Sequence, residues 1–371
     1  MGLFFGTLVL AEMFMLSRVP AVLAEWLVDR MKTGRWAMVA LCLLSGFISA
    51  FVENVAVVLL VAPVALSVSK RLNTSPVPLL IGIAVSSNLQ GTATMIGDPP
   101  SMIFAGFKQM GFLDFFVYQG RPGIFFAVEI GAVASLLVLF YVFRHERQTV
   151  SKVEVERPRS WVPTILLIFL VLALSISTIP DPEFKWFAGA VTLVLALAGT
   201  LWFVFGSKWG SFKELFSAID WDTTLFLIGI FIIVGGLSDA GWLDKLAVWL
   251  GNGLGSNTLL AFIVVVAMAV ILSAFIDNVP FLLTMLPVVN KIAEQMGGSD
   301  TALLYGLLIG ACLGGNITPI GASANVVTLG ILRKQGHVVS FGKFMSIGVP
   351  FTIVAVAAAS LFVWFVWGTV L

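Results

Sequence analysis

Charged residues are scarce in this sequence. Only 11% of the 371 residues are Asp, Glu, Lys or Arg, while 59% are hydrophobic. An average soluble domain carries about 25% charged residues, so this chain has too few polar side chains to coat a water-soluble globule of its length. The composition therefore excludes a soluble protein and indicates an integral membrane protein.

The sequence also lacks the residue patterns that are typical of structural disulfides, enzyme active sites and nucleic-acid-binding surfaces. The two cysteines, Cys42 and Cys312, both lie in apolar segments, where a buried thiol is ordinary and a structural disulfide is unusual. The formal net charge is +1, and the basic residues stand at segment ends, so we expect no nucleic-acid partner. No metal-ligand spacing, nucleophile and base pair or phosphate loop occurs, so we expect neither an enzyme nor an organic cofactor.

Long apolar segments are what the sequence does contain. Several reach the roughly 20 residues of a membrane-spanning helix and lack the alternation of barrel strands, so we expect an all-α polytopic membrane protein. The segments lie at about 2–16, 36–68, 79–106, 122–143, 161–179, 184–206, 222–237, 258–290, 301–331 and 348–370.

Two of these segments, 36–68 and 258–290, are interrupted midway by an acid and an asparagine. The pairs are Glu53-Asn54 and Asp277-Asn278. Each arm of such a segment would rise only about 25 Å, short of the roughly 30 Å hydrocarbon core. We interpret both segments as re-entrant helical hairpins. The alternative is two full spans joined by a tight turn, which would put the carboxylates in water.

The two hairpins belong to an internal repeat. A shift of 224 residues aligns 49–106 with 273–330 without a gap, with identical residues at 18 of 58 positions. Five spans separate the hairpins, an odd number, so the second copy enters the membrane from the opposite face. The sequence thus predicts an inverted repeat with a first copy at 1–143, a basic cytoplasmic linker at 144–160 and a second copy at 161–371.

In each copy the segment after the hairpin carries helix breakers in mid-span. They occur in "GTATMIGDPPS" (91–101) and in "LGGNITPIGASAN" (313–325). Glycine and proline remove helical stiffness and hydrogen bonds, and broken helices are tolerated at membrane depth where they line a cavity. We therefore expect two broken transmembrane helices to converge with the two hairpin tips near mid-membrane.

These motifs, together with "SAFVENV" (49–55) and "SAFIDNVPFLLTMLPV" (273–288), resemble the ion transporter superfamily. The likeness is strongest to its arsenite-permease and sodium/proton-antiporter branch, with the P-protein-like and citrate-transporter-like permeases, and extends to the divalent anion/sodium symporters. The resemblance implies a scaffold around a mobile transport domain, an elevator-type motion and a homodimer in the cytoplasmic (inner) membrane.

The resemblance also implies site residues. Asn54 and Asn278 match the tip asparagines of the sodium-coupled dicarboxylate branch, and Gly97 and Gly321 match break positions that offer backbone oxygens. We expect a monovalent cation at Glu53, Asn54 and Gly97, and another at Asp277, Asn278 and Gly321. The full predicted set of substrate- and ion-binding residues is Glu53, Asn54, Thr92, Gly97, Asp98, Ser101, Asp277, Asn278, Asn316, Gly321, Ser323 and Asn325.

Acids at membrane depth are the leading candidates, because burying a bare charge is costly. Glu53 and Asp277 correspond in the repeat, which favours a functional role over the alternative of helix capping. Asp98 has no acidic counterpart in the second copy and stands before a proline pair, so a cap is its competing role. For Glu12 and Glu129 a structural polar contact is at least as good an interpretation.

A fixed anion at each tip repels dicarboxylates and suits cations. The sequence therefore predicts a secondary active transporter that exchanges a cation or small inorganic species against protons or sodium. Sodium-coupled transport of carboxylates or other anions is the alternative, ahead of an ion channel or an intramembrane enzyme. The expected partners are the transported ion or small molecule, the lipid bilayer and a second copy of the chain, and the expected coupling ion is H⁺ or Na⁺.

Two further expectations concern topology and the N-terminus. The basic flanks of the first hairpin place Ser69 and Arg147 in the cytoplasm, with Ser299 and Asp181 outside. The first copy starts without the two spans that precede the matching helix of the second copy. We therefore expect two helices of the family to be absent, with 4–15 forming a scaffold helix beside uncovered apolar surface.

Overall fold

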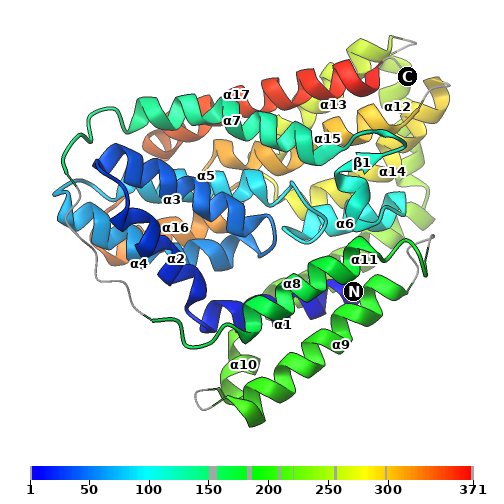
Figure 1. Ribbon diagram of the computed structural model, residues 1–371. Helices are drawn as coiled ribbons and strands as arrows, with labels where there is room; N and C mark the ends of the chain where they lie inside the picture. The colour runs from blue at the N-terminus through cyan, green and yellow to red at the C-terminus, as the bar shows by residue number, and fades with distance from the viewer. Residues whose placement is uncertain are drawn as a thin grey trace.

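The protein is described by a computed structural model that covers residues 2–149, 157–181, 186–207, 210–219, 221–254, 257–296 and 299–368. Part of the predicted linker, 150–156, therefore lies outside the described residues. Within these ranges the chain forms seventeen α-helices and one small hairpin of strands β1 (Val117–Tyr118) and β2 (Arg121–Pro122). Figure 1 shows a helical bundle, so the expected all-α class is confirmed.

The helices of the first half are α1 (Gly2–Leu16), α2 (Val19–Asp29), α3 (Gly34–Ser49), α4 (Asn54–Arg71), α5 (Val77–Gln90), α6 (Pro99–Lys108) and α7 (Ile124–Val142), with a 3-10 turn at Phe112–Phe115. The helices of the second half are α8 (Val162–Ser175), α9 (Phe187–Leu201), α10 (Phe212–Ala218), α11 (Trp221–Asp239), α12 (Trp242–Leu254), α13 (Thr258–Ser273), α14 (Asn278–Met296), α15 (Thr301–Gly314), α16 (Ser323–Lys334) and α17 (Phe341–Trp367), with a π-turn at Trp202–Gly206 and a 3-10 turn at Gly315–Ile317.

Helices of membrane-spanning length are present. Among the described residues, four spans are long and apolar enough to cross a bilayer alone, namely α4, α7, α17 and the continuous stretch from α9 to Gly206. Two bent pairs pass the same test together, α1 with α2 at 53° and α11 with α12 at 70°. Helices α3 and α13 have 16 residues each, a rise of about 24 Å, so neither alone reaches across the roughly 30 Å core.

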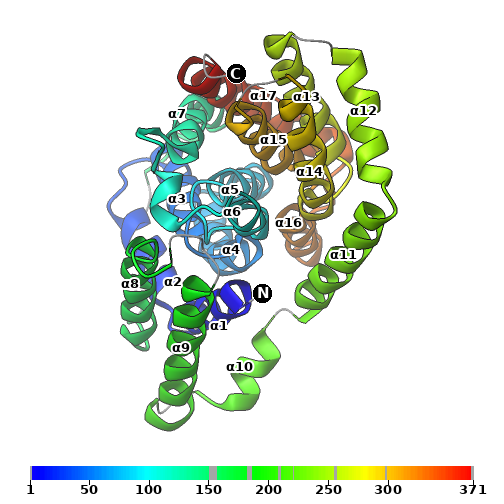
Figure 2. The same cartoon turned by 90° about the vertical axis from the view of Figure 1, so that its right-hand side faces the viewer.

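The centre of the molecule is built on α5 and α15, which are predominantly apolar and are buried on all sides. Every residue of α15 is buried, as are twelve of the fourteen residues of α5. A helix without a polar face is stable only when protein or lipid surrounds it completely. In Figure 2, α4, α5 and α6 occupy the middle, with α14, α15 and α16 beside them and α7 and α17 along one edge.

The apolar surface that was expected to lie uncovered beside α1 is covered. Helices α8 and α9 pack against α1, where Gly6 leaves room for Thr192, and ten of the fifteen residues of α1 are buried. Exposed apolar side chains occur on α11 on the opposite flank, where Leu225 is 64% and Ile232 is 71% exposed (Figure 2), and also on α7, α8, α9 and α17. The prediction of an exposed face beside α1 is therefore wrong, because the first two helices of the second half cover it.

The elements recur along the chain at one spacing. Helices α3, α4, α5 and α6 begin 224 residues before α13, α14, α15 and α16. The breaks have the same backbone geometry: Gly91 and Gly315 both have φ −56° and ψ −23°, and Asp98 and Ala322 have φ −149° and −148°. Residues that differ chemically thus occupy equivalent places in two copies of one local structure.

Two positions chosen for the topology prediction are buried. Ser69 lies inside the α4 packing, and the Asp181 carboxylate accepts hydrogen bonds from the backbone N–H groups of Trp186 and Phe187 at 2.7 and 2.9 Å. Asp181 therefore caps the start of α9, and it makes a poor reporter of which side of the membrane it occupies. Ser75, exposed after α4, is a better reporter.

Candidate cation-binding site

Four helices begin at one cavity of about 70 Å³. Helices α4 and α14 start there after the hairpin tips, and α6 and α16 start there after the helix breaks. The lining residues are Glu53, Asn54, Val55, Asn88, Asp98, Pro99, Thr223, Phe226, Leu227, Asp277, Asn278, Val279, Ala322, Ser323 and Ala324. The convergence of tips and breaks expected from the sequence is thus present in the fold.

Three acids stand at these helix starts. Glu53 and Asp98 occupy the N-cap positions of α4 and α6, and Asp277 immediately precedes α14. The Asp277 carboxylate accepts a hydrogen bond from the backbone N–H of Val279 at 3.0 Å, so this acid does cap its helix. Ala322 holds the equivalent place before α16. The acids are therefore unevenly divided, two in the first half and one in the second.

The electrostatic balance of the cavity favours one additional positive charge. No Lys, Arg or His is among the described residues that line it. Each helix N-terminus carries roughly half a positive charge, so the four together supply about two. Three ionised carboxylates would exceed this by about one negative charge. A single monovalent cation or a single proton restores neutrality.

Asp98 lies between the two hairpin tips. Nδ2 of Asn278 donates a hydrogen bond to its Oδ2 at 3.4 Å, and the side chain of Asn54 interacts with the same carboxyl group. Only 6% of Asp98 is exposed. The repeat pattern favoured Glu53 and Asp277, whereas the geometry makes Asp98 the acid that both copies contact.

Each break is tied to the tip of its own hairpin. Oγ1 of Thr94 donates to the carbonyl of Ala50, and Oγ1 of Thr318 donates to the carbonyl of Ala274. Neither threonine is in the predicted set. The sequence did indicate them, because the two are identical residues at matching positions of the repeat. In the first tip, Oγ of Ser49 also donates to Oδ1 of Asn54 at 2.5 Å, leaving the Asn54 amide N–H groups for other partners.

Gly97 and Gly321 permit the breaks to touch the tips. A Cβ on Gly97 would lie 2.7 Å from the carbonyl oxygen of Ser49, and a Cβ on Gly321 would lie 2.8 Å from that of Ala274. Real Cβ atoms do not approach oxygen so closely, so any other residue would push the break away from the tip. These glycines therefore set the spacing of the site, and neither lines the 70 Å³ cavity.

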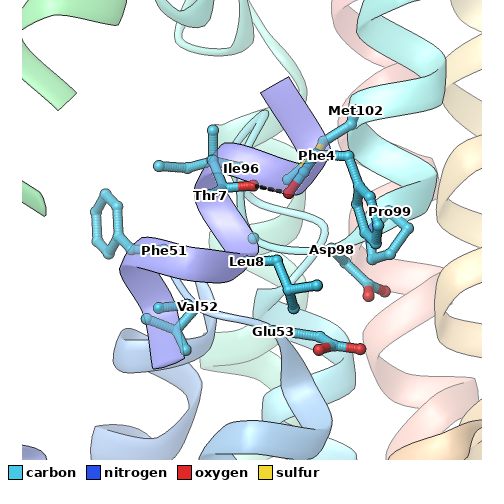
Figure 3. Close-up of a pocket in the computed structure, with 12 residues that line it drawn as sticks. Phe4, Thr7, Leu8, Phe51, Val52, Glu53, Ile96, Asp98, Pro99 and Met102 are labelled. Atoms are coloured by element: carbon cyan, nitrogen blue, oxygen red, sulfur yellow. Dashed lines mark hydrogen bonds between the residues drawn. The ribbon is translucent and has the colours of Figure 1, made fainter. Parts of the chain in front are cut away.

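Helix α1 closes one side of the tip. Figure 3 shows Leu8 and Phe4 of α1 facing Glu53 and Asp98, with a small cavity of about 20 Å³ between them. A larger, mostly apolar cavity of about 310 Å³ adjoins it, shares Pro99, and lies among α1, α6 and α11. The site therefore lies where the tips and breaks face α1 and α11, the first helices of the two bent pairs.

The model of the citrate transporter family matches this chain twice, over residues 1–207 and again over residues 185–371. The chain belongs to the citrate transporter family. The two matched stretches together cover the whole chain. The likeness drawn from the tip and break motifs is confirmed.

Relatives of this family member include further transporters. An uncharacterized transporter of Mycobacterium tuberculosis is 33% identical over 339 residues, which cover 88% of this chain and 76% of the relative. The P protein of Homo sapiens is 28% identical over 406 residues, covering 88% of this chain and 48% of the P protein. Family membership therefore identifies this chain as a transporter.

Two solved transporter structures have the same fold. The YdaH transporter of Alcanivorax borkumensis superposes with a TM-score of 0.66 at 14% identity, over 98% of this chain and 84% of that chain. MtrF of Neisseria gonorrhoeae superposes with a TM-score of 0.63 at 14% identity, over 99% and 81%. This family member is thus a multi-pass helical membrane protein.

Six of the twelve predicted residues line the 70 Å³ cavity of this citrate transporter family member: Glu53, Asn54, Asp98, Asp277, Asn278 and Ser323. The other six lie in or behind the breaks. Oγ of Ser101 donates to the carbonyl of Gly91 at 3.5 Å, and Nδ2 of its repeat partner Asn325 donates to the carbonyl of Gly315 at 2.9 Å. Ser101 and Asn325 therefore hold the two breaks in shape.

The remaining acid candidates lie outside the cavity. Glu129 on α7 accepts a hydrogen bond from Nε2 of Gln90 at 3.1 Å, and Glu12 on α1 is only partly buried. Neither lines the 70 Å³ cavity.

Two polar residues that line the cavity, Asn88 and Thr223, are absent from the predicted set. Asn88 is the more deeply buried of the two. Its sequence signal was weak, because α5 also carries Ser86, Ser87 and Gln90 and because the repeat partner of Asn88 is Cys312.

Proposed function

We propose that this transporter is a secondary active exchanger that moves a monovalent cation, or a comparably small inorganic species, against protons across the cytoplasmic (inner) membrane. The observation that carries the proposal is the position of Asp98. This acid is buried between the two tip asparagines, in a cavity with two further carboxylates and no basic residue among its described lining.

The charge balance supports a competition between cation and proton. Three ionised carboxylates facing four helix N-termini give the cavity a net charge of about −1, which one cation or one proton neutralises. Binding both at once would give it a net charge of about +1, so the cation and the proton compete. A cavity of 70 Å³ holds about five water molecules, enough for a small ion that retains some water.

The proposal includes an elevator-type motion. Helices α3–α6 and α13–α16, which carry both tips and both breaks, would form the mobile transport domain, and the bent pairs with α7 and α17 would form the scaffold. The copies 1–143 and 161–371, joined by the linker 144–160, would then be an inverted repeat, and two chains would form a homodimer. This division is supported by the side chains that α11 presents to the 70 Å³ cavity and that α1 presents to the 20 Å³ cavity beside it.

Sodium-coupled transport of a carboxylate or other anion is the second candidate. The observation in its favour is that four helix N-termini point at one cavity, an arrangement that binds anions elsewhere. The name of the matching family agrees with an anionic substrate. The three acids oppose it, because each must be neutralised by sodium or protons before an anion enters.

The two functions are separated by flux measurements on purified protein in proteoliposomes. A trapped pH dye would follow proton movement on addition of Na⁺, Li⁺, K⁺ or choline, and labelled citrate, succinate and arsenite would be tested for uptake. Exchange predicts saturable, cation-driven alkalinisation without uptake of any anion. Sodium-dependent uptake of an anion without cation-driven proton movement would instead establish the second candidate.

A further inference from the structure

Asn88 is a buried amide that joins the two halves of the molecule. It lies on α5, is 2% exposed, and lines the 70 Å³ cavity together with Asp98. Its Nδ2 donates to Oδ1 of Asn316 at 2.8 Å and to Oδ1 of Asn325 at 3.0 Å. Both partners belong to the break of the second half, so this contact crosses the repeat.

Backbone carbonyls fix the orientation of all three amides. Nδ2 of Asn325 donates to the carbonyls of Gly315 and Thr318, both at 2.9 Å, and Nδ2 of Asn316 donates to the carbonyl of Val85 at 3.2 Å. The Oδ1 atoms of Asn316 and Asn325 must therefore face Asn88. Turning the Asn88 amide over would set oxygen against oxygen, so its Nδ2 stays toward the second half.

The Asn88 carbonyl oxygen is consequently without a partner. Oδ1 is buried and accepts no hydrogen bond from any described residue. A buried carbonyl that loses water and gains no replacement is costly, and such atoms are rare in folded proteins. The residue that carries this unpartnered oxygen lines a cavity that also holds three carboxylates and, among its described lining residues, no basic group. An amide oxygen in such surroundings suits a cation and offers no donor to an anion.

We propose that Oδ1 of Asn88 is the neutral ligand of an alkali cation whose charge is balanced by the Asp98 carboxylate. This inference rests on the proposed cation exchange. Neither ligand has an equivalent in the second half, where Cys312 and Ala322 occupy the matching positions. The site therefore holds one cation on the side of the first half, in place of the two symmetric cations that the repeat suggested.

The two ligands have different effects on cation and proton. An amide oxygen coordinates a metal ion but does not take up a proton at any physiological pH, whereas the carboxylates of Glu53, Asp98 and Asp277 do both. Removing the Asn88 oxygen should therefore weaken the cation and spare the proton. A purely structural role for Asn88 would disturb both.

The test uses variants that the repeat itself supplies. Asn88→Cys installs the residue that the second half buries at the matching position. Asn88→Leu keeps the branched frame of the side chain and replaces both amide groups by methyl groups, so it removes the oxygen together with the Nδ2 donor. Ser87→Ala is the matched control, because Ser87 is also buried on α5 with an unpartnered hydroxyl, does not line the cavity, and corresponds to Ala311. All are compared as purified full-length protein in proteoliposomes.

The measured quantities are the Na⁺ and Li⁺ concentrations that give half-maximal proton exchange, and the pH of half-maximal exchange at saturating cation. We expect Asn88→Cys and Asn88→Leu to raise the half-maximal cation concentration about 10- to 100-fold, the usual effect of one lost polar ligand of a charged group. The pH midpoint should stay at the wild-type value, and Ser87→Ala should match wild type in both measurements.

Thermal unfolding in detergent checks binding without transport. NaCl should raise the melting temperature of wild type and Ser87→Ala above its value in choline chloride, and should not raise that of Asn88→Leu.

Unchanged cation affinity in both Asn88 variants would overturn the inference and leave the exchange function intact. A loss of cation affinity accompanied by an equally large shift of the pH midpoint would overturn it as well. Asn88 would then have only the structural role of holding the two halves together. A wild-type protein that exchanges no alkali cation would overturn the proposed function, and this inference with it.

Discussion

Replacing Asp98 by Asn removes one charge from the centre of the site and keeps the side-chain shape. Asp98 contacts both tip asparagines and is almost fully buried. A cation about 4 Å from this carboxylate is attracted by about 4 kcal/mol at an effective dielectric constant of 20. Losing that attraction should weaken cation binding roughly a thousandfold, enough to abolish exchange at millimolar sodium.

The same substitution should leave the fold intact. The amide of Asp98→Asn keeps an oxygen that can accept from Nδ2 of Asn278, and burying a neutral group costs less than burying a charge. We therefore expect the free energy of unfolding to change by less than about 1 kcal/mol, or to increase. Thermal unfolding in detergent measures the stability of the variant, and the sodium-driven dye assay in proteoliposomes measures its exchange activity.

Asp300→Asn is the control for a general loss of acidic charge. Asp300 pairs with Nζ of Lys108 at 2.7 Å and does not line the cavity, so this variant should still exchange. The reasoning is refuted if Asp98→Asn, folded and inserted, exchanges sodium for protons with wild-type affinity. Asp98 would then serve only as a polar contact of the two tip asparagines, and the charge balance of the cavity would lose its basis.

Three further outcomes are expected. Single cysteines at Ser75 and Ser299, which are partners in the repeat, should react with impermeant reagent from opposite sides of the membrane; labelling from the same side would disprove the inversion. Gly97→Ala and Gly321→Ala should each lower the melting temperature and the transport rate, because the new methyl group meets tip carbonyls; wild-type stability and rate in both would contradict the close approach. Glu129→Gln should retain exchange within about twofold in the dye assay, because an amide oxygen can still accept the bond from α5; a complete loss would make Glu129 part of the proton path.

The sequence was sufficient for the class of protein and for its local structure. A bilayer admits only backbones whose hydrogen bonds are satisfied within the segment, so composition and apolar length determined a polytopic helical protein. Glycine and proline act on their own neighbours in the chain, so the positions of the breaks after the hairpins follow from the local sequence. The repeat and the family followed from the same motifs, and six of the twelve predicted residues line the cavity.

Tertiary structure alone decided how the site is divided between the two copies. Asp98 meets Asn278 across 180 residues of sequence, and Asn88 meets Asn325 across 237, and no helical periodicity encodes such contacts. The repeat pointed to a symmetric pair of acids at the tips. In the part of the chain that the structure describes, one acid lies between the tips and one buried amide oxygen lacks a hydrogen-bond partner, because the two copies face each other and one central cavity serves both. Which helices cover α1 was settled in the same way, by packing between distant segments rather than by any local pattern.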